Sequence, residues 1–333
     1  MMTYLKPRAV IVGTGSYLPA NIVTNDDLAQ KVDTSDEWIK SRTGIRERRI
    51  LAEAEATSDM CVKAAERALK DADISAAELD LIVVGTVTPD MLFPSTACIV
   101  QDKIGAKKAT AFDLSAGCTG FIYALATGSS FLEAGLYKNA LVIGSDAVSR
   151  VVDWSDRGTC VLFGDGAGAV VLQASNSEEG IIGSYLRSDG SGAHFLHLPA
   201  GGSRLPATVK TINDALHSLK MEGREVFKFA VKAMEEATRR VLEENGLSLE
   251  EVNHLIPHQA NIRIIESSLK RLGLAEDKVF VNLHKYGNMS GASVPVALDE
   301  AAKQGKFKKG DLLVLVAFGA GLTWGSSAVR WAK

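Results

Sequence analysis

The chain has 333 residues, which is enough for two ordinary domains or for one large duplicated fold. Hydrophobic residues make up 46% of the chain and charged residues 23%, a balance typical of a protein with a large buried core. The formal net charge is only −3, which gives no indication of a nucleic-acid-binding protein.

The apolar runs are short and predict buried strands. The first, "AVIVGTGSYLP", begins at Ala9 and does not have the pattern of a signal peptide. The longest, "LIVVGTV" and "LLVLVAFGAG", fall far short of the ~20 residues that a transmembrane helix needs. We therefore expect a protein without a membrane partner.

The four cysteines, Cys61, Cys98, Cys118 and Cys160, show neither CxxC pairing nor a metal-ligand spacing with histidine. With no sign of export, we expect reduced thiols, a cytoplasmic location and no metal site. Cys118 is unusual in its position, because "DLSAGCTGF" changes there from a strand pattern to a helical pattern. A thiolate at the first turn of a helix would face unpaired backbone N–H groups and the positive end of the helix dipole.

A weak repeat with a spacing of 173 residues runs through the chain, from Ser75 and again from Ser248. Each copy begins with a polar helix end, an apolar strand and a loop. A second strand, a glycine-containing turn and a small-residue helix start follow, in "ATAFDLSAGCTGF" and in "VFVNLHKYGNMSG". A buried strand ends each copy. The pattern predicts a duplicated α/β fold with halves at residues 1–175 and 176–333, which join near residues 172 to 183.

The repeat makes two pairs of loops equivalent. Gly85 in the first half corresponds to His258 in the second, and Cys118 corresponds to Asn288. If the halves pack about a pseudo-twofold axis, the ends of equivalent strands converge, and α/β sheets place ligands at such ends. We therefore expect Cys118, His258 and Asn288 to share one pocket.

Each of these three residues also has a simpler interpretation. A lone cysteine in an apolar setting is more often an inert small hydrophobe, which we expect for Cys61, Cys98 and Cys160. His258 could be a hydrogen-bonded core histidine, and Asn288 a turn residue with positive φ. The three residues together carry more information than any one of them.

Two glycine-rich segments do not predict a nucleotide site. In "GTGSYL", Leu18 replaces the third glycine of a dinucleotide fingerprint, and "FGDGAGAVVL" continues as a strand where a phosphate-binding helix is needed. We expect these glycines to permit close backbone packing beneath the pocket.

Six segments together resemble beta-ketoacyl-acyl carrier protein synthase III: "TNDDLAQKVDTSDEWIKSRTGIRERRI", "FDLSAGCTGF", "DRGTCVLFGDGAGA", "IPHQANIRI", "YGNMSGASVP" and "AFGAGLTWGSS". The resemblance covers essentially the whole chain in the right order. It implies the thiolase fold, an internally duplicated five-layer αβαβα architecture with two mixed sheets, and a homodimer. It also implies an acyltransferase that begins type II fatty acid synthesis.

In the implied reaction, the Cys118 thiol takes the acyl group of a short acyl-CoA such as acetyl-CoA. Malonyl-acyl carrier protein then loses CO2, and its carbanion attacks the thioester. Neutral His258 and Asn288 would stabilise the enolate oxygen. Backbone N–H groups of Cys118 and Ala320 would form a second oxyanion hole, although the family often has glycine at position 320. Gly319 would line the pocket, and Phe318 would screen the thiol from water; no cofactor is implied.

The resemblance also implies the contacts with CoA. Trp38 would stack on the adenine, and Arg42 would pair with a phosphate. Arg224 departs from family members that have asparagine there, so we expect no contact from that side chain. The complete implied CoA-binding set is Thr34, Trp38, Arg42, Arg157, Gly158, Gly223, Phe227, Ala260 and Asn261.

Acyl carrier protein is acidic, so the resemblance implies a basic docking face for it. Charged helical positions are by default a solvated surface, but the family's docking region coincides with Gln259, Arg263, Lys228, Lys232, Lys270 and Arg271. Phe93 matches a position that closes the end of the dimer partner's acyl pocket. A bulky residue at position 93 favours a short primer of two to a few carbons.

Three other functions remain as alternatives. A biosynthetic thiolase needs a second catalytic cysteine in the C-terminal half, and the chain has no cysteine after Cys160. A plant-type polyketide synthase would use free malonyl-CoA, whereas a basic face favours a protein-bound substrate. A non-catalytic scaffold of the same fold would have no reason to keep all three polar pocket residues.

Overall fold

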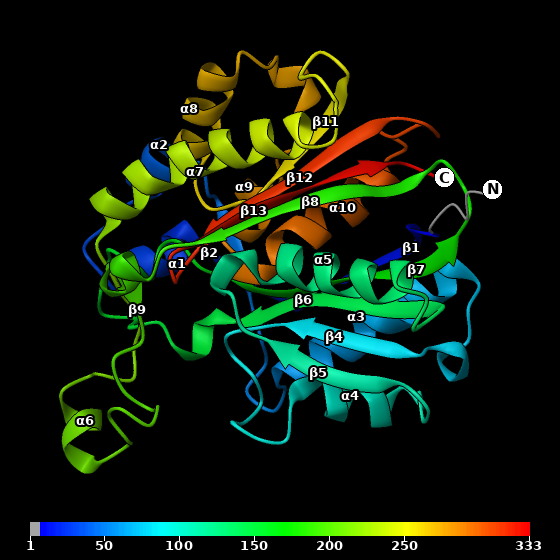
Figure 1. The fold of residues 1–333 in the computed structure, drawn as a ribbon. Helices are drawn as coiled ribbons and strands as arrows, with labels where there is room; N and C mark the ends of the chain where they lie inside the picture. The colour runs from blue at the N-terminus through cyan, green and yellow to red at the C-terminus, as the bar shows by residue number, and fades with distance from the viewer. Residues whose placement is uncertain (1–6) are drawn as a thin grey trace.

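The structure is a computed structural model that describes residues 7–333, and it consists of two β-sheets with helices between them and outside them (Figure 1). The first sheet has the strand order β1-β7-β6-β4-β5 and the second β11-β12-β13-β8. The strands of the first sheet are β1 (Arg8–Tyr17), β4 (Leu81–Gly85), β5 (Thr110–Leu114), β6 (Asn139–Ala147) and β7 (Asp165–Ser175). Those of the second are β8 (Gly180–Ser188), β11 (Val252–Pro257), β12 (Leu312–Gly319) and β13 (Thr323–Arg330).

Six helices complete five layers. Helices α5 (Gly120–Glu133) and α10 (Ser293–Lys303) lie between the sheets, as Figure 1 shows. The outer face of the first sheet carries α3 (Thr57–Ala72) and α4 (Thr96–Lys103), and that of the second carries α7 (Gly223–Glu243) and α8 (Ile262–Leu272). The order αβαβα confirms the fold class that the sequence predicts.

The two sheets also confirm the internal duplication. In the first, β4 pairs parallel with β6, which pairs antiparallel with β7, which pairs antiparallel with β1. In the second, β11 pairs parallel with β12, which pairs antiparallel with β13, which pairs antiparallel with β8. The first sheet is built from residues 8–175 and the second from residues 180–330.

One predicted strand is wrong. The segment "VFVN" at 279–282, expected to correspond to β5, makes only a single parallel bridge between Val279 and Leu255. The backbone N–H groups of Asn282 and Leu283 donate to the Gln259 side-chain oxygen, at 3.1 and 3.3 Å. The chain then enters the short helix α9 (Leu283–Tyr286), so within residues 7–333 the second sheet has four strands.

The layers are held by three buried apolar clusters. One fills the space between α7, α8 and the second sheet, one lies between the two sheets, and one lies beneath α3 and α4. Helix α7 is apolar on one side only, because its other side is exposed. Helix α5, "GFIYALATGSSFLE", is apolar on most sides, because it is covered by both sheets.

The smaller elements lie around these layers. The hairpin of β2 (Asn21–Thr24) and β3 (Glu47–Ile50) encloses α1 (Asn25–Ala29) and α2 (Asp36–Thr43). The two-residue strands β9 (Leu196–His197) and β10 (Lys220–Met221) pair with each other. Between them the chain forms α6 (Val209–Asn213), which stands away from the layers in Figure 1.

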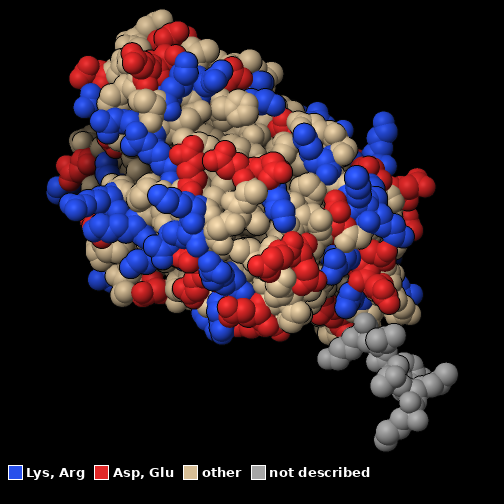
Figure 2. All heavy atoms as spheres, turned by 90° about the horizontal axis from the view of Figure 1, so that it is seen from above, with Lys and Arg blue, Asp and Glu red and all other residues tan. Residues whose placement is uncertain are grey.

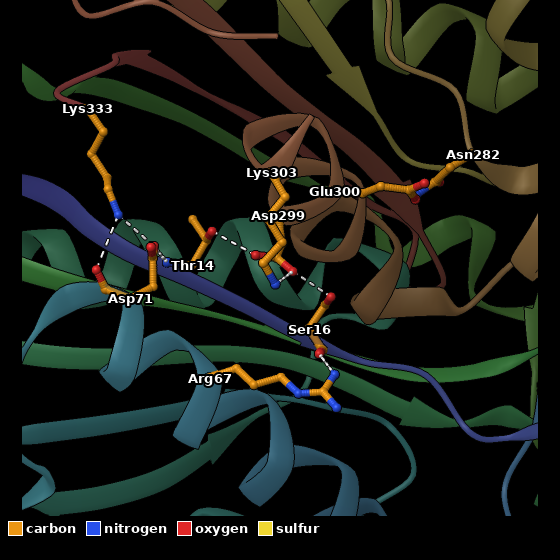
Figure 3. Close-up of polar contacts among 9 residues, drawn as sticks. All are labelled: Thr14, Ser16, Arg67, Asp71, Asn282, Asp299, Glu300, Lys303 and Lys333. Carbon is orange, nitrogen blue, oxygen red and sulfur yellow. Dashed lines mark hydrogen bonds and ion pairs between the residues drawn. The ribbon is translucent and has the colours of Figure 1, made fainter. Parts of the chain in front are cut away.

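A buried polar contact ties the first strand to α10. Figure 3 shows Asp299 of α10 facing Thr14 and Ser16 of β1. The fully buried Asp299 carboxylate accepts from the Thr14 hydroxyl at 2.8 Å, from the Ser16 hydroxyl at 2.5 Å and from Lys303 Nζ at 2.7 Å. This contact joins an element of the second half to the first sheet.

Close packing beneath the loop at 286–292 needs glycine in β7. A Cβ at Gly166 would lie 2.7 Å from the Met289 sulfur, and a Cβ at Gly168 would lie 2.7 Å from the Pro295 backbone. These glycines lie in a strand, as expected, and no phosphate-binding loop forms there.

Candidate active site

Three loops from the two sheets meet at one cavity of about 160 Å³. Cys118 comes from the turn before α5, His258 from the end of β11, and Asn288 from the turn before α10. All three residues line this cavity, as the repeat and the resemblance led us to expect. The convergence follows from the duplicated topology, because equivalent strand ends meet between the sheets.

Cys118 lies in a 3-10 turn, Gly117–Thr119, that leads directly into α5. The side chain is buried, and burial raises the pKa of the thiol to about 12, while a hydrogen bond from the Ser290 hydroxyl opposes this rise. From the sequence we expect the helix start to lower the pKa of the thiol, but the effect of burial is larger and raises it. The negative charge of the nearby Asp146 raises the pKa of the thiol further.

His258 is 1% exposed, and its Nδ1 lies 2.6 Å from the Ser293 hydroxyl. The Ser293 oxygen also accepts from the Gln259 N–H at 3.4 Å, which leaves its own proton for Nδ1. Nε2 is buried and has no partner among the described residues. Burial lowers the pKa of His258 to about 3, so the ring is neutral near pH 7 and Nε2 is a free hydrogen-bonding atom.

Asn288 is fixed by its backbone and by its side chain. Its N–H donates to Leu162 O at 2.8 Å, and its C=O accepts from the Gly164 N–H at 3.0 Å. Its side-chain oxygen accepts from the Ser290 N–H at 2.9 Å. Because the oxygen is occupied in this way, the amide nitrogen is the group available to donate into the cavity.

The backbones of Cys118 and Ala320 approach each other closely. A Cβ at Gly319 would lie 2.5 Å from the Cys118 nitrogen, and a Cβ at Gly117 would lie 2.7 Å from the Ala320 nitrogen. Phe318 and Gly319 both line the cavity, and the Phe318 ring meets the His258 ring edge-on at 5.2 Å. The predicted oxyanion and pocket residues are thus neighbours.

Four of the residues expected to bind CoA also line the cavity: Gly223, Phe227, Ala260 and Asn261. Sequence reasoning missed six further lining residues, all of them apolar, which are Leu162, Phe163, Leu196, Met221, Val226 and Ile264. Apolar character is common to all core residues, so only the folded position of each of these side chains separates it from the core.

The remaining residues expected to bind CoA gather around Trp38 on α2. The Arg42 and Arg157 guanidinium groups lie 4.8 and 5.4 Å from the Trp38 ring centroid. Thr34 precedes α2, and its buried hydroxyl has no partner in the part of the chain that the structure describes. Gly158 follows Arg157 and is exposed. An aromatic face flanked by two cations can bind a base with adjacent phosphates.

This group lies beside the cavity rather than in it. Arg263, on the first turn of α8, donates to Ser41 O of α2 at 2.8 Å. The neighbouring residues Asn261 and Ile264 line the cavity. Helix α8 thus connects the Trp38 group with the pocket that contains Cys118.

The predicted docking set is basic and exposed, with one correction. Gln259 is fully buried, and its side chain bonds to the backbone of Pro257, Phe280, Asn282 and Leu283, so it cannot form a docking surface. Figure 2, which looks down on α7 and α8, shows lysine and arginine side chains gathered on the side where α7 begins. The exposed members are Arg263, Lys228, Lys232, Lys270 and Arg271.

Phe93 does not line the cavity of its own chain. It lies on an apolar loop between β4 and α4, where the Leu92 and Phe93 residues are 80% and 84% exposed. Within residues 7–333, no helix is long and apolar enough to cross a membrane, and no cluster of histidine, cysteine and carboxylate side chains could hold a metal ion.

Family models described as 3-oxoacyl-[acyl-carrier-protein (ACP)] synthase III match residues 112–190 and, for the C-terminal part, residues 242–331. A beta-ketoacyl-[acyl-carrier-protein] synthase III of Caldanaerobacter subterraneus subsp. tengcongensis is 59% identical over 328 residues, 98% of this chain and 99% of that protein. The chain belongs to the beta-ketoacyl-acyl carrier protein synthase III family.

Solved structures agree with membership of the synthase III family. The 3-oxoacyl-[acyl-carrier-protein] synthase III of Aquifex aeolicus is 50% identical, with a TM-score of 0.91, and the match covers 97% of this chain and 100% of that one. The priming beta-ketosynthase of the R1128 polyketide pathway is 35% identical, also with a TM-score of 0.91, over 100% and 99% of the two chains. The synthase III fold thus extends over the whole described chain.

Proposed function

We propose that the protein condenses a short acyl-CoA, typically acetyl-CoA, with malonyl-acyl carrier protein. The products are 3-oxoacyl-acyl carrier protein, CO2 and CoA, and the reaction initiates fatty acid biosynthesis. The observation that carries the proposal is the convergence of Cys118, His258 and Asn288 on one buried cavity. Family membership supports the same reaction.

In the first step the Cys118 sulfur attacks the acyl-CoA carbonyl carbon, and CoA leaves with the proton of the thiol. The negative oxygen of the tetrahedral intermediate would accept hydrogen bonds from the Cys118 and Ala320 N–H groups. A thioester on a buried cysteine is protected from water by the Phe318 ring and by the apolar walls of the cavity.

In the second step the malonyl group loses CO2, and the electron pair of the broken bond moves onto the thioester as an enolate. His258 Nε2 and the Asn288 amide nitrogen are the two donors available for the enolate oxygen. The carbanion then attacks the acyl carbon on Cys118, and the sulfur leaves as a thiolate that takes up a proton from solvent, since the original thiol proton left with CoA. Both substrates are already activated as thioesters, so the reaction needs no metal or organic cofactor.

We place the CoA adenine against Trp38, between Arg42 and Arg157, and the pantetheine arm along Gly223, Phe227, Ala260 and Asn261. The first group holds an aromatic ring and two cations, and the second lines the cavity. The acidic carrier protein would dock on the exposed basic side chains of α7 and α8, in a cytoplasm that keeps the four cysteines reduced.

We also propose that the protein acts as a homodimer. The loop with Leu92 and Phe93 exposes large apolar side chains that a second copy would cover. In such a dimer Phe93 would close the acyl end of the partner's cavity and favour a short primer.

The test is product formation by purified protein with acetyl-CoA and either malonyl-acyl carrier protein or malonyl-CoA. We expect acetoacetyl-acyl carrier protein and CO2 with the protein-bound substrate. Preference for free malonyl-CoA would support a polyketide-type enzyme instead, a candidate favoured by the 35% identical priming ketosynthase. Absence of turnover with both substrates would support a non-catalytic scaffold.

A further inference from the structure

A buried carboxylate lies next to the active site without taking part in the reaction steps described above. Asp146, near the end of β6, is fully buried. Its Oδ1 accepts from the Thr86 hydroxyl at 2.9 Å, from the Val87 N–H at 2.8 Å, and from the Thr88 N–H and hydroxyl at 3.2 and 3.0 Å. Its Oδ2 accepts from the Gly291 N–H at 2.9 Å.

The Gly291 contact connects Asp146 to the loop that carries Asn288. In this loop Ser290 has a φ of +49°, a left-handed conformation that is unfavourable for residues other than glycine. The Ser290 N–H holds the side-chain oxygen of Asn288. A residue in a disfavoured conformation keeps it only where its neighbours are fixed, and the Asp146 bond fixes the next residue.

The Ser290 hydroxyl completes the connection to the nucleophile. This hydroxyl lowers the pKa of Asp146 and that of Cys118, although burial raises both, and its single proton can be donated to only one of the two groups at a time. Asp146, Ser290, Asn288 and Cys118 therefore form one continuous network. Asp146 and Cys118 come from the first half of the sequence, and the other two residues come from the second.

The packing around this contact leaves little room for movement. A Cβ at Gly291 would lie 3.2 Å from Asp146 Oδ2 and 3.3 Å from Gly85 O. A Cβ at Gly144, two residues before Asp146 on β6, would lie 2.2 Å from Gly291 O. The carboxylate and the loop are therefore in direct contact, so a small displacement of one displaces the other.

We propose that Asp146 is a positioning residue for the condensation step: it holds the Asn288–Gly291 loop so that the Asn288 amide faces the enolate oxygen. Asp146 itself does not line the cavity, and its contact with the loop is the hydrogen bond from Gly291. The inference rests on the proposed function. In this proposal Asp146, from the first half of the chain, aligns the Asn288 amide donor in the second half.

The first test is Asp146→Asn. The new amide places an NH2 group against an N–H or hydroxyl donor, which displaces either the loop at Gly291 or the segment at 86–88. We expect the condensation kcat to fall by about 10- to 100-fold, less than complete loss of an oxyanion donor, while the KM for acetyl-CoA changes by less than about twofold. Acetylation of Cys118, measured in a single turnover, should fall much less than condensation.

Asp299→Asn is the matched control. Asp299 is also fully buried and accepts three hydrogen bonds (Figure 3). Its partners Thr14, Ser16 and Lys303 do not line the cavity. We expect this variant to have a lower melting temperature and wild-type kcat. If Asp146→Asn also loses only thermal stability, or if it loses acetylation and condensation equally, the inference is wrong.

Gly291→Ala keeps the carboxylate and moves the loop, so it tests the same contact if Asp146→Asn fails to fold. We expect a selective loss of condensation kcat, and Gly202→Ala, at a position with open space around it, is the control. Wild-type condensation activity in the same assay tests the proposed function separately. An active wild type with a fully active Gly291→Ala variant would overturn the inference alone.

Discussion

Burial dominates the chemistry of Cys118 at the scale of single residues. The thiol lies at a helix start, but the cost of removing a thiolate from water exceeds the favourable interactions there, and its pKa rises to about 12. His258 responds to the same burial in the opposite direction, with a pKa lowered to about 3. Both groups are therefore neutral near pH 7.

The raised pKa of Cys118 gives a pH dependence with a definite sign. The thiolate is the reactive form, so its fraction increases about tenfold for each pH unit below a pKa of about 12. We expect the rate of Cys118 alkylation by iodoacetamide, followed by peptide mass spectrometry, to keep rising between pH 7 and pH 10. A plateau below pH 8 would show that the helix start, rather than burial, controls the thiol.

At the scale of elements, α7 and α8 present basic side chains with different environments. Lys228 pairs with Glu225 at 2.7 Å and Arg271 with Glu235, while Arg263 is engaged with the α2 backbone. Lys232 and Lys270 are exposed and have no ion pair with any residue in the range 7–333. Substitution of these two lysines therefore changes the surface charge without breaking an ion pair within the chain.

Lys232→Glu combined with Lys270→Glu should raise the KM for malonyl-acyl carrier protein by roughly tenfold, since charge reversal opposes an acidic partner. The KM for acetyl-CoA should stay unchanged, because neither side chain lines the cavity. Steady-state kinetics at low and moderate salt measure both constants. Lys107→Glu, at an exposed position after α4, is the control, and an equal effect of this variant would exclude a specific docking face.

The elements also show how far the sequence could predict this site. The repeat and the family resemblance placed Cys118, His258 and Asn288 together, because sheet topology alone brings equivalent strand ends to one place. They misassigned Gln259, whose amide satisfies backbone groups of the segment that replaces the missing fifth strand. The contact between Asp146 and Gly291 spans 145 residues, and no local pattern in the sequence reveals such a pair.

For the whole molecule, the exposed apolar loop at Leu92 and Phe93 is a feature that a single chain leaves unexplained. If a second copy covers this loop, Phe93→Thr should lengthen the acyl-CoA primers that the enzyme accepts, because a bulky side chain at the end of the cavity is removed. A primer panel from two to eight carbons, with the mass in solution measured by sedimentation, checks both points. A monomeric wild type, or an unchanged primer preference in a stable dimer, would contradict this role.

We propose a division of labour within one cavity, in which Cys118 carries the acyl group while His258 and Asn288 stabilise the enolate. A histidine with a pKa of about 3 is a poor acceptor for the proton of a thiol with a pKa of about 12, so acylation should not depend on it.

The measurement is labelled acetyl incorporation from acetyl-CoA together with CO2 release from malonyl-acyl carrier protein, for wild type, Cys118→Ala, His258→Ala and Asn288→Ala. We expect His258→Ala and Asn288→Ala to keep acetylation and to lose decarboxylation by about 10²–10³-fold each. Cys118→Ala should lose acetylation and retain decarboxylation. If His258→Ala lost acetylation as completely as Cys118→Ala, the histidine would be the base for the thiol and the division of labour would be wrong.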